Sequence, residues 1–217
     1  MSEKKRTIVK FRVKLKEKCI PAHPLISKLI YWGKTFSRLG LMPSNDCGQT
    51  LGNLSFRLKK GKNAFVITAS GTKSDFCLDS FILVTLVNFK RKMVYAIGNR
   101  MPSSESMLHF LLYRSFPDIN AIFHGHCEKI LKAAKKLNFP VTDKEEPYGT
   151  LALANKAIAA AKEGDFFILK NHGFVAIGKD MDESGETALN AFRIATKACL
   201  RQASSKTLRG IIYSFSR

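Results

Sequence analysis

The stretch AIFHGHCEKI, residues 121–130, ends an apolar run with two histidines that stand one residue apart. Alternate side chains of a β-strand point to the same face, so His124 and His126 would present two imidazoles side by side. Such a pair suits a metal ion, although an isolated H-x-H pair is more often two ordinary core or surface residues. The rest of the sequence has to decide between these interpretations.

The segments around this run alternate between strand and helix patterns. Short apolar or alternating segments predict strands at 54–59, 64–70, 80–89, 92–98, 119–124 and 165–178, the last as two strands joined by the turn KNHG. Apolar residues at helical spacing predict helices at 25–41, 104–116, 128–138, 150–163 and 182–203. These elements interleave without a regular β-α-β rhythm, which favours a mixed or mainly antiparallel sheet covered by helices.

Length and composition indicate one globular domain. The chain has 217 residues, of which 45% are hydrophobic and 24% charged, and this is enough to bury a single core. No apolar run reaches the roughly 20 residues that span a bilayer, and the basic N-terminus lacks the apolar core of a signal peptide. The five cysteines are scattered without a C-x-x-C pair, which predicts reduced thiols. We therefore expect a cytoplasmic protein.

The chain is strongly basic, with 36 Lys and Arg against 17 Asp and Glu and a formal net charge of +19. Clusters at 58–62, 89–92 and 129–136 concentrate this charge, which would attract phosphorylated metabolites, nucleic acid or anionic membranes. No nucleic-acid-binding motif accompanies the clusters, so we expect most lysines to serve solubility and neither nucleic acid nor a membrane to be a partner. Residues 7–16 alternate apolar and basic side chains and predict an amphipathic strand at a sheet edge.

Polar residues in several turns are further candidates for a binding site. His172 lies in the turn KNHGF, where an imidazole can point inward, and three neutral imidazoles with an open position form a catalytic zinc pattern. Glu105 follows two serines at a predicted helix start, which makes either an anion site or a plain N-cap with an acidic first turn. The turns at 48–57 and 67–73 can cradle phosphate, but they lack the fingerprints of nucleotide binding.

Five stretches of the sequence form a pattern when they are taken in order. They are TLGNLSFR (50–57), ITASGT (67–72), PSSESMLHFLLYRSFPDINAIFHGH (102–126), YGTLALA (148–154) and LKNHGFVAIGKDMDE (169–183). Together they cover most of residues 25–200, and in this order they resemble the class II aldolase/adducin family. Gly125 is a departure, because relatives often carry Thr, Ser or another small residue between the two histidines.

The resemblance implies an α/β fold, a three-layer α/β/α sandwich around a central, mainly antiparallel sheet. On this basis residues 23–205 form the catalytic domain, 1–22 a basic N-terminal extension and 206–217 a C-terminal tail. The resemblance also implies a homotetramer with active sites at subunit interfaces, where a neighbouring chain contributes residues. Tyr113 and Tyr213 are candidates for an interfacial acid, with helix packing and an ordinary tail tyrosine as the stronger interpretations.

Individual positions of this sequence match the functional positions of the family. The resemblance implies that His124, His126 and His172 bind Zn²⁺ or another divalent metal. It implies that Glu105 ligates the empty metal and acts as the catalytic acid and base when substrate displaces it. The residues that match the family's substrate-phosphate pocket are Gly52, Asn53, Ser70, Gly71, Ser103 and Ser104.

The function implied is a zinc-dependent aldolase that acts on a small phosphorylated sugar. Retro-aldol cleavage of a ketose 1-phosphate through a metal-stabilised enediolate would give dihydroxyacetone phosphate and an aldehyde. A sugar-phosphate 4-epimerase, a decarboxylase or a dehydratase on the same metal site are alternatives, although residues 139–149 lack the acidic and aromatic pair of the epimerases. A metal-free, adducin-like scaffold that binds an acidic partner is an alternative of another class. An active enzyme whose basic surface also binds nucleic acid is a third possibility.

Overall fold

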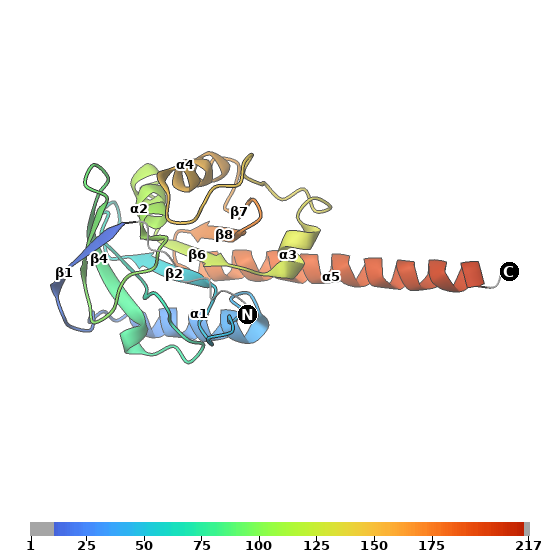
Figure 1. Cartoon of the computed structure of the whole chain (residues 1–217), viewed down its shortest axis with the longest axis horizontal. Helices are drawn as coiled ribbons and strands as arrows, with labels where there is room; N and C mark the ends of the chain where they lie inside the picture. The colour runs from blue at the N-terminus through green and yellow to red at the C-terminus, as the bar shows by residue number, and fades with distance from the viewer. Residues whose placement is uncertain (1–10, 215–217) are drawn as a thin grey trace, which may run out of the picture.

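The computed structural model describes the backbone of residues 11–214 and the side chains of residues 11–201. Within this part of the chain, eight strands form one sheet (Figure 1). The strands are β1 Arg12–Glu17, β2 Gly52–Arg57, β3 Phe65–Thr68, β4 Phe81–Asn88, β5 Met93–Ile97, β6 Ala121–Gly125, β7 Phe166–Leu169 and β8 Gly173–Gly178. Their order is β1-β5-β4-β3-β2-β6-β8-β7, and every neighbouring pair is antiparallel except β1 and β5. The predicted α/β fold with a mainly antiparallel sheet is confirmed.

Helices cover both faces of this sheet (Figure 1). They are α1 Ile26–Leu39, α2 Ser106–Ser115, α3 Glu128–Ala133, α4 Leu151–Ala160, α5 Met181–Ser214 and the short 3₁₀ helix η1 Leu78–Ser80. On one face α2 and α4 pack against each other, whereas α1, α3 and α5 lie on the other face. In the described part of the chain, no helix combines the length and hydropathy that a membrane crossing requires.

The central strand β6 explains why the sequence around the two histidines is so apolar. Its side chains alternate between two cores, because Ala121 and Phe123 pack with α1, α3 and α5, whereas Ile122 packs with α2 and α4. A strand covered on both faces needs apolar residues at nearly every position. Each fully buried large apolar side chain stabilises the fold by about 1.5–3 kcal/mol. His124 continues the alternation and therefore points to the same face as α2.

The helix ends follow local signals in the sequence. Gly40 adopts a left-handed φ of 73° and closes α1, which lies within the helix predicted at 25–41. Thr150 caps α4, and its hydroxyl oxygen accepts the N–H of Leu153 at 3.2 Å. The last helix, α5, continues to Ser214, beyond the predicted end at 203, because no proline interrupts this stretch. Asp180 caps its first turn by accepting two backbone N–H groups, a signal that the sequence analysis missed.

A buried guanidinium fixes the end of α2. Arg57 is 4% exposed and donates from Nε to the carbonyl oxygen of Ile119 at 2.9 Å. Its Nη2 donates to the carbonyl oxygens of Tyr113 and Phe116 at 2.6 and 3.0 Å. A buried charge is tolerated only where its donors are satisfied. Arg57 therefore ties β2 to α2 and to the segment that leads into β6.

The edge strand β1 pairs in parallel with β5. Lys14 and Lys16 are exposed, whereas Val13 and Leu15 are half-buried, as the alternating sequence predicts. Lysines at such an edge discourage pairing with a further strand. Residues 7–10 of the predicted strand lie outside the described residues.

A close approach of three segments explains the glycine between the two histidines of β6. A Cβ on Gly125 would lie 2.3 Å from the carbonyl oxygen of Leu41 and 2.8 Å from the ring of Phe174. A Cβ on Gly173 would likewise lie 2.6 Å from the carbonyl oxygen of Gly125 and 2.7 Å from the imidazole of His124. In this chain the residue between the histidines therefore has no room for a side chain.

Replacing Gly125 with alanine tests this packing. Gly125→Ala is expected to lower the free energy of unfolding by about 1–3 kcal/mol or more, because the Leu41 carbonyl must move to admit a methyl group. Gly164→Ala is the matched control, since nothing lies within 4 Å of its Cβ position, and its effect should stay within about 0.5 kcal/mol. Urea denaturation at neutral pH measures both. An unchanged midpoint for Gly125→Ala would contradict the close approach.

Candidate metal centre and active-site cleft

Three imidazoles meet where β6 ends. His124 belongs to β6, His126 follows the strand directly, and His172 comes from the turn between β7 and β8. One ligand atom from each of them lies within 4.8 Å of those of the other two. The ring centroids are 4.8–5.0 Å apart in all three pairs. The structure thus brings together the three histidines that the sequence analysis singled out.

The orientation of His124 is fixed by the neighbouring strand. Its Nδ1 lies 2.7 Å from the carbonyl oxygen of Phe174 in β8, and a carbonyl oxygen only accepts hydrogen bonds. Nδ1 therefore carries the proton, and Nε2 is left with a bare lone pair that points away from β8. This tautomer is the one that a metal ligand needs.

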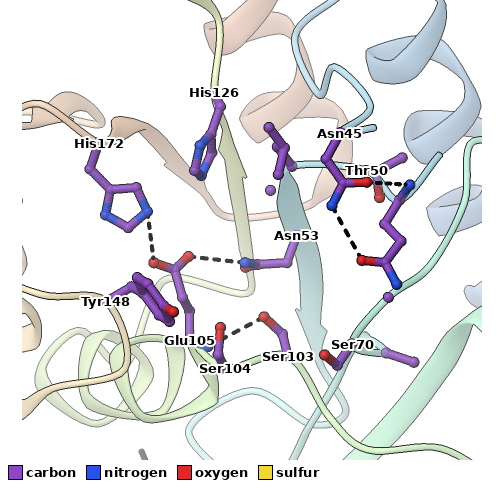
Figure 2. Close-up of a pocket in the computed structure, with 15 residues that line it drawn as sticks. Asn45, Thr50, Asn53, Ser70, Ser103, Ser104, Glu105, His126, Tyr148 and His172 are labelled. Atoms are coloured by element: carbon purple, nitrogen blue, oxygen red, sulfur yellow. Dashed lines mark hydrogen bonds and ion pairs between the residues drawn. The ribbon is translucent and has the colours of Figure 1, made fainter. Parts of the chain in front are cut away.

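Glu105 faces the histidines from the first residue before α2 (Figure 2). Its carboxylate is buried, and Oε2 accepts a hydrogen bond of 3.0 Å from Nδ2 of Asn53. Oε1 lies 3.3 Å from Nε2 of His172, but it accepts no hydrogen bond from the described residues. A buried carboxylate oxygen without a hydrogen bond is costly, and here it is aimed at the histidine cluster.

The same geometry places two acceptors opposite each other. The bare Nε2 of His124 lies 3.1 Å from Oε2 of Glu105 and 3.0 Å from Nε2 of His126. Nε2 of His126 can donate to that of His124, but the lone pairs of His124 Nε2 and Glu105 Oε2 repel at this distance unless a cation joins them. The donor set, three imidazole nitrogens and one carboxylate, is also one that divalent transition metals accept. These residues therefore fit a divalent metal, whose identity the donors alone do not fix.

The pKa values of Glu105 and of the histidines also favour metal binding. Burial raises the pKa of Glu105, but the imidazoles of His124 and His172 and the hydrogen bond from Asn53 outweigh it and lower the pKa to about 2. Burial lowers the pKa of His124, and it lowers the pKa of His126 to about 3. At neutral pH the site therefore offers the carboxylate of Glu105 and neutral imidazoles at His124 and His126, which are the forms that bind metal.

Behind Glu105, one turn further along α2, lies a second buried polar cluster. The Nδ1 of His109 is 2.7 Å from the hydroxyl oxygen of Ser55, which is also 2.7 Å from the phenol oxygen of Tyr113. Burial lowers the pKa of His109 to about 3 and raises the pKa of Tyr113. The phenol of Tyr113 is therefore committed to the interior of this chain, in agreement with the helix-packing interpretation. The side chain of Tyr213 lies outside the described residues.

The buried neutral state of His109 predicts a pH dependence of stability. Its pKa falls from 6.5 to about 3 on folding, so below pH 6.5 the unfolded chain binds a proton that the folded chain excludes. The resulting stability is lost as pH falls through this window, by at most about 1.4 kcal/mol per pH unit. Metal-free His109→Gln should show a shallower decline of unfolding free energy than metal-free wild type in urea titrations. Parallel curves would contradict a neutral His109.

A cleft of about 300 Å³ opens beside the histidines. It is lined by all six residues that the resemblance assigned to a phosphate pocket, namely Gly52, Asn53, Ser70, Gly71, Ser103 and Ser104. Pairing between two loops assembles this end of the cleft, because the N–H of Ser70 donates to Met101 at 2.8 Å and that of Ser103 to Thr68 at 3.1 Å. Segments at 67–73 and 101–105 are thus held against each other although they are far apart in the sequence.

The cleft also contains residues to which the sequence analysis gave no role. They are Asn45, Gln49, Thr50 and Tyr148. The side chain of Asn45 holds the loop before β2 by accepting the backbone N–H of Gln49 at 3.0 Å and donating to its side chain at 3.3 Å (Figure 2). Tyr148 lines the same cleft as Glu105. The only signals were the polar loop PSNDCGQT and the motif YGT, neither of which specifies a direction for these side chains.

Comparison with known proteins assigns the class. Residues 27–199 match the family model of the Class II Aldolase and Adducin N-terminal domain. Since this match spans most of the chain, the protein belongs to the class II aldolase and adducin family, as the sequence pattern predicts.

Individual relatives are enzymes of two kinds. An L-fuculose phosphate aldolase of Methanococcus maripaludis strain C5 is 32% identical over 150 residues, which are 61% of this chain and 75% of that protein. A methylthioribulose-1-phosphate dehydratase of Yersinia enterocolitica is 40% identical over 81 residues, 37% of this chain and 35% of that protein. A solved L-fuculose 1-phosphate aldolase has the same fold, with a TM-score of 0.68 at 24% identity over 85% of this chain and 89% of that chain.

Proposed function

We propose that this protein is a divalent-metal-dependent aldolase, with zinc as the first candidate metal, that cleaves a ketose 1-phosphate into dihydroxyacetone phosphate and an aldehyde. The observation that carries the proposal is the buried pair of facing acceptors, Nε2 of His124 and Oε2 of Glu105, 3.1 Å apart. Such a pair is stable when a cation joins it, and the cleft of phosphate-binding character lies directly beside it. The similarity to an L-fuculose phosphate aldolase supports the same class of reaction.

In this proposal His124, His126 and His172 hold the metal, and Glu105 completes the ligand set when no substrate is present. The metal would supply Lewis acidity at the ketose carbonyl, which stabilises negative charge on the adjacent carbon. The buried position of His124 and its hydrogen bond to Phe174 keep the ligand geometry rigid.

The other end of the cleft holds the substrate phosphate. Asn53, Ser70, Ser103 and Ser104 offer neutral donors, and glycines at 52 and 71 let the backbone approach closely, with φ values of 126° and 71°. Binding the phosphate at this remote end fixes the carbonyl carbon relative to the histidines, which raises the effective concentration of the reacting groups.

Glu105 moves the proton of the reaction. In the cleavage direction the Glu105 carboxylate takes the proton of the hydroxyl on the fourth carbon as the bond between the third and fourth carbons of the ketose breaks and the aldehyde leaves. The electron pair stays on the third carbon as an enediolate, and the Glu105 carboxyl group delivers a proton there to complete dihydroxyacetone phosphate. Asn53 donates to the same carboxylate and keeps it aimed at the site.

Dehydration of a ketose 1-phosphate is the second candidate, because the local similarity to a methylthioribulose-1-phosphate dehydratase reaches 40% identity over 81 residues. This reaction starts with the same polarised carbonyl. Glu105 would then remove the proton of the third carbon, and the hydroxyl of the fourth carbon would leave as water.

Our proposal also includes a homotetramer with interfacial active sites, a cytoplasmic location and catalytic-domain boundaries at 23–205. The metal-free scaffold is the less favoured alternative, since the ligand set is complete.

Metal content tests the foundation of the proposal. Wild-type protein purified without immobilised nickel and incubated with Zn²⁺ is expected to retain about one ion per chain. His172→Ala should lose the ion and still fold, because this side chain comes from a turn and not from a core strand. Elemental mass spectrometry and circular dichroism measure both properties. A folded wild type without bound metal would favour the scaffold.

The role of Glu105 is tested separately from metal binding. Glu105→Gln should keep the metal through the three histidines and lose about 10²–10⁴-fold in turnover, because it lacks the proton-transfer group. Glu128→Gln is the matched control, as Glu128 is exposed on α3 and pairs with Lys132 at 2.7 Å. The assay follows aldehyde release and water elimination from a panel of ketose 1-phosphates. Full turnover by Glu105→Gln would refute the assignment, and the product formed decides between cleavage and dehydration.

A further inference from the structure

The phosphate end of the cleft lacks a positive charge among the side chains that line it. The fifteen lining residues, all in the described part of the chain, include Glu105 as an acid but neither Lys nor Arg. A phosphate monoester near neutral pH carries close to two negative charges, and the carboxylate of Glu105 in the same cleft repels it. Neutral hydroxyl and amide donors orient such a group, but they do not balance its charge. A metal held by the histidines would balance the charge of Glu105 at its own end of the cleft, so a positive charge beside the phosphate has to come from the next layer of residues.

Arg100 lies in that layer. It stands three residues before Ser103, in the segment that links β5 to the serines of the cleft. Its Nη2 donates to the carbonyl oxygen of Ser70 at 3.0 Å. The same atom lies 3.9 Å from the position of a Cβ on Gly71, and the side-chain amide of Gln49 lies 3.0 Å from that position. The guanidinium therefore reaches the space over Gly71 together with a side chain of the cleft wall.

The guanidinium of Arg100 is available to a ligand. It is half-buried, and with the described residues it forms no ion pair. The neighbouring carboxylate, Asp79, instead accepts a hydrogen bond from Asn99. A guanidinium has five N–H donors in a planar fork that matches phosphate, and one of the five is used on Ser70. This differs from Arg57, whose donors are taken up by backbone carbonyls.

We propose that Arg100 binds the substrate phosphate and makes this cleft selective for phosphorylated over unphosphorylated ketoses. This inference rests on the proposed function, because it deepens the assignment of the phosphate end of the same cleft. Ser70, Ser103 and Ser104 set the position of the phosphate, and Arg100 supplies the charge. The hydrogen bond from Arg100 to the carbonyl oxygen of Ser70 holds the guanidinium next to the serine that positions the phosphate. Arg100 takes no part in the bond-breaking step.

Three variants separate charge from structure. Arg100→Gln removes the charge but keeps a donor for the Ser70 carbonyl, and Arg100→Lys keeps the charge but loses the planar fork. Arg91→Gln is the matched control, because it removes the same charge from an exposed turn where, toward the residues that the structure describes, only the backbone of Arg91 makes hydrogen bonds. Each variant is loaded with metal, and its metal content is measured before use.

Steady-state kinetics compare a ketose 1-phosphate with the corresponding free ketose. Arg100→Gln should raise KM for the phosphorylated substrate by about tenfold to a hundredfold, with kcat and the kcat/KM for the free ketose unchanged. Arg100→Lys should recover part of the loss, and Arg91→Gln should behave as wild type. Equal losses on both substrates, or no loss on either, would overturn the proposal. Equal losses would mean that Arg100 only supports the Ser70 loop.

A binding measurement keeps this inference distinct from the proposed function. Isothermal titration of the metal-loaded protein with inorganic phosphate should give an affinity that falls about tenfold or more in Arg100→Gln and stays constant in Arg91→Gln. If wild type turns over no ketose phosphate, the proposed function fails, and this titration still decides the role of Arg100. Phosphate binding that is the same in wild type and Arg100→Gln would overturn the inference, even if the enzyme were an active aldolase.

Discussion

The candidate site depends on the register of β6 between β2 and β8. His124 stands opposite Asn53 on one side and Val175 on the other, and Asn53 in turn holds the carboxylate of Glu105. A slip of one residue would turn His124 toward α1 and α5 and remove these contacts. The apolar side chains of β6, which alternate between two cores, oppose such a slip, and Gly125 fixes the strand end because only a glycine fits against the loop after α1.

A rigid register allows the fold to hold groups that repel one another. The facing acceptors of His124 and Glu105 are unfavourable in the absence of a cation, and the surrounding core bears this local strain. A metal ion would relieve it, so the ion would bind the folded chain more tightly than the unfolded chain and would stabilise the fold by mass action. The buried His109 and Tyr113 behind Glu105 keep that side of α2 neutral, so the charge of the site is confined to the cleft.

Sequence reasoning was sufficient where the signal is local. The two-residue period places His124 and His126 on one face, and Gly40 ends α1 where a left-handed residue is needed. The contact of Glu105 and His172 with this pair depends on long-range strand pairing. The sequence indicated His172 through a turn that can point an imidazole inward, and it linked Glu105 to the metal only through resemblance to a family. The structure adds Asn45, Gln49, Thr50, Arg100 and Tyr148. Their positions follow from loop paths and from pairing between loops, neither of which has a sequence period.

The same site is compatible with two reactions because they share the first step and differ at the far end of the substrate. In the proposed binding mode the phosphate lies near Ser70 and the carbonyl near the histidines, so the leaving group would lie beyond these histidines. Cleavage needs a base for the hydroxyl of the fourth carbon, whereas dehydration needs an acid for that oxygen. Tyr148 is a protic side chain that lines the same cleft as Glu105. Under the proposed function, the side chain that takes a proton from the oxygen of the fourth carbon, or gives one to it, therefore selects the bond that breaks. The metal does not make this selection.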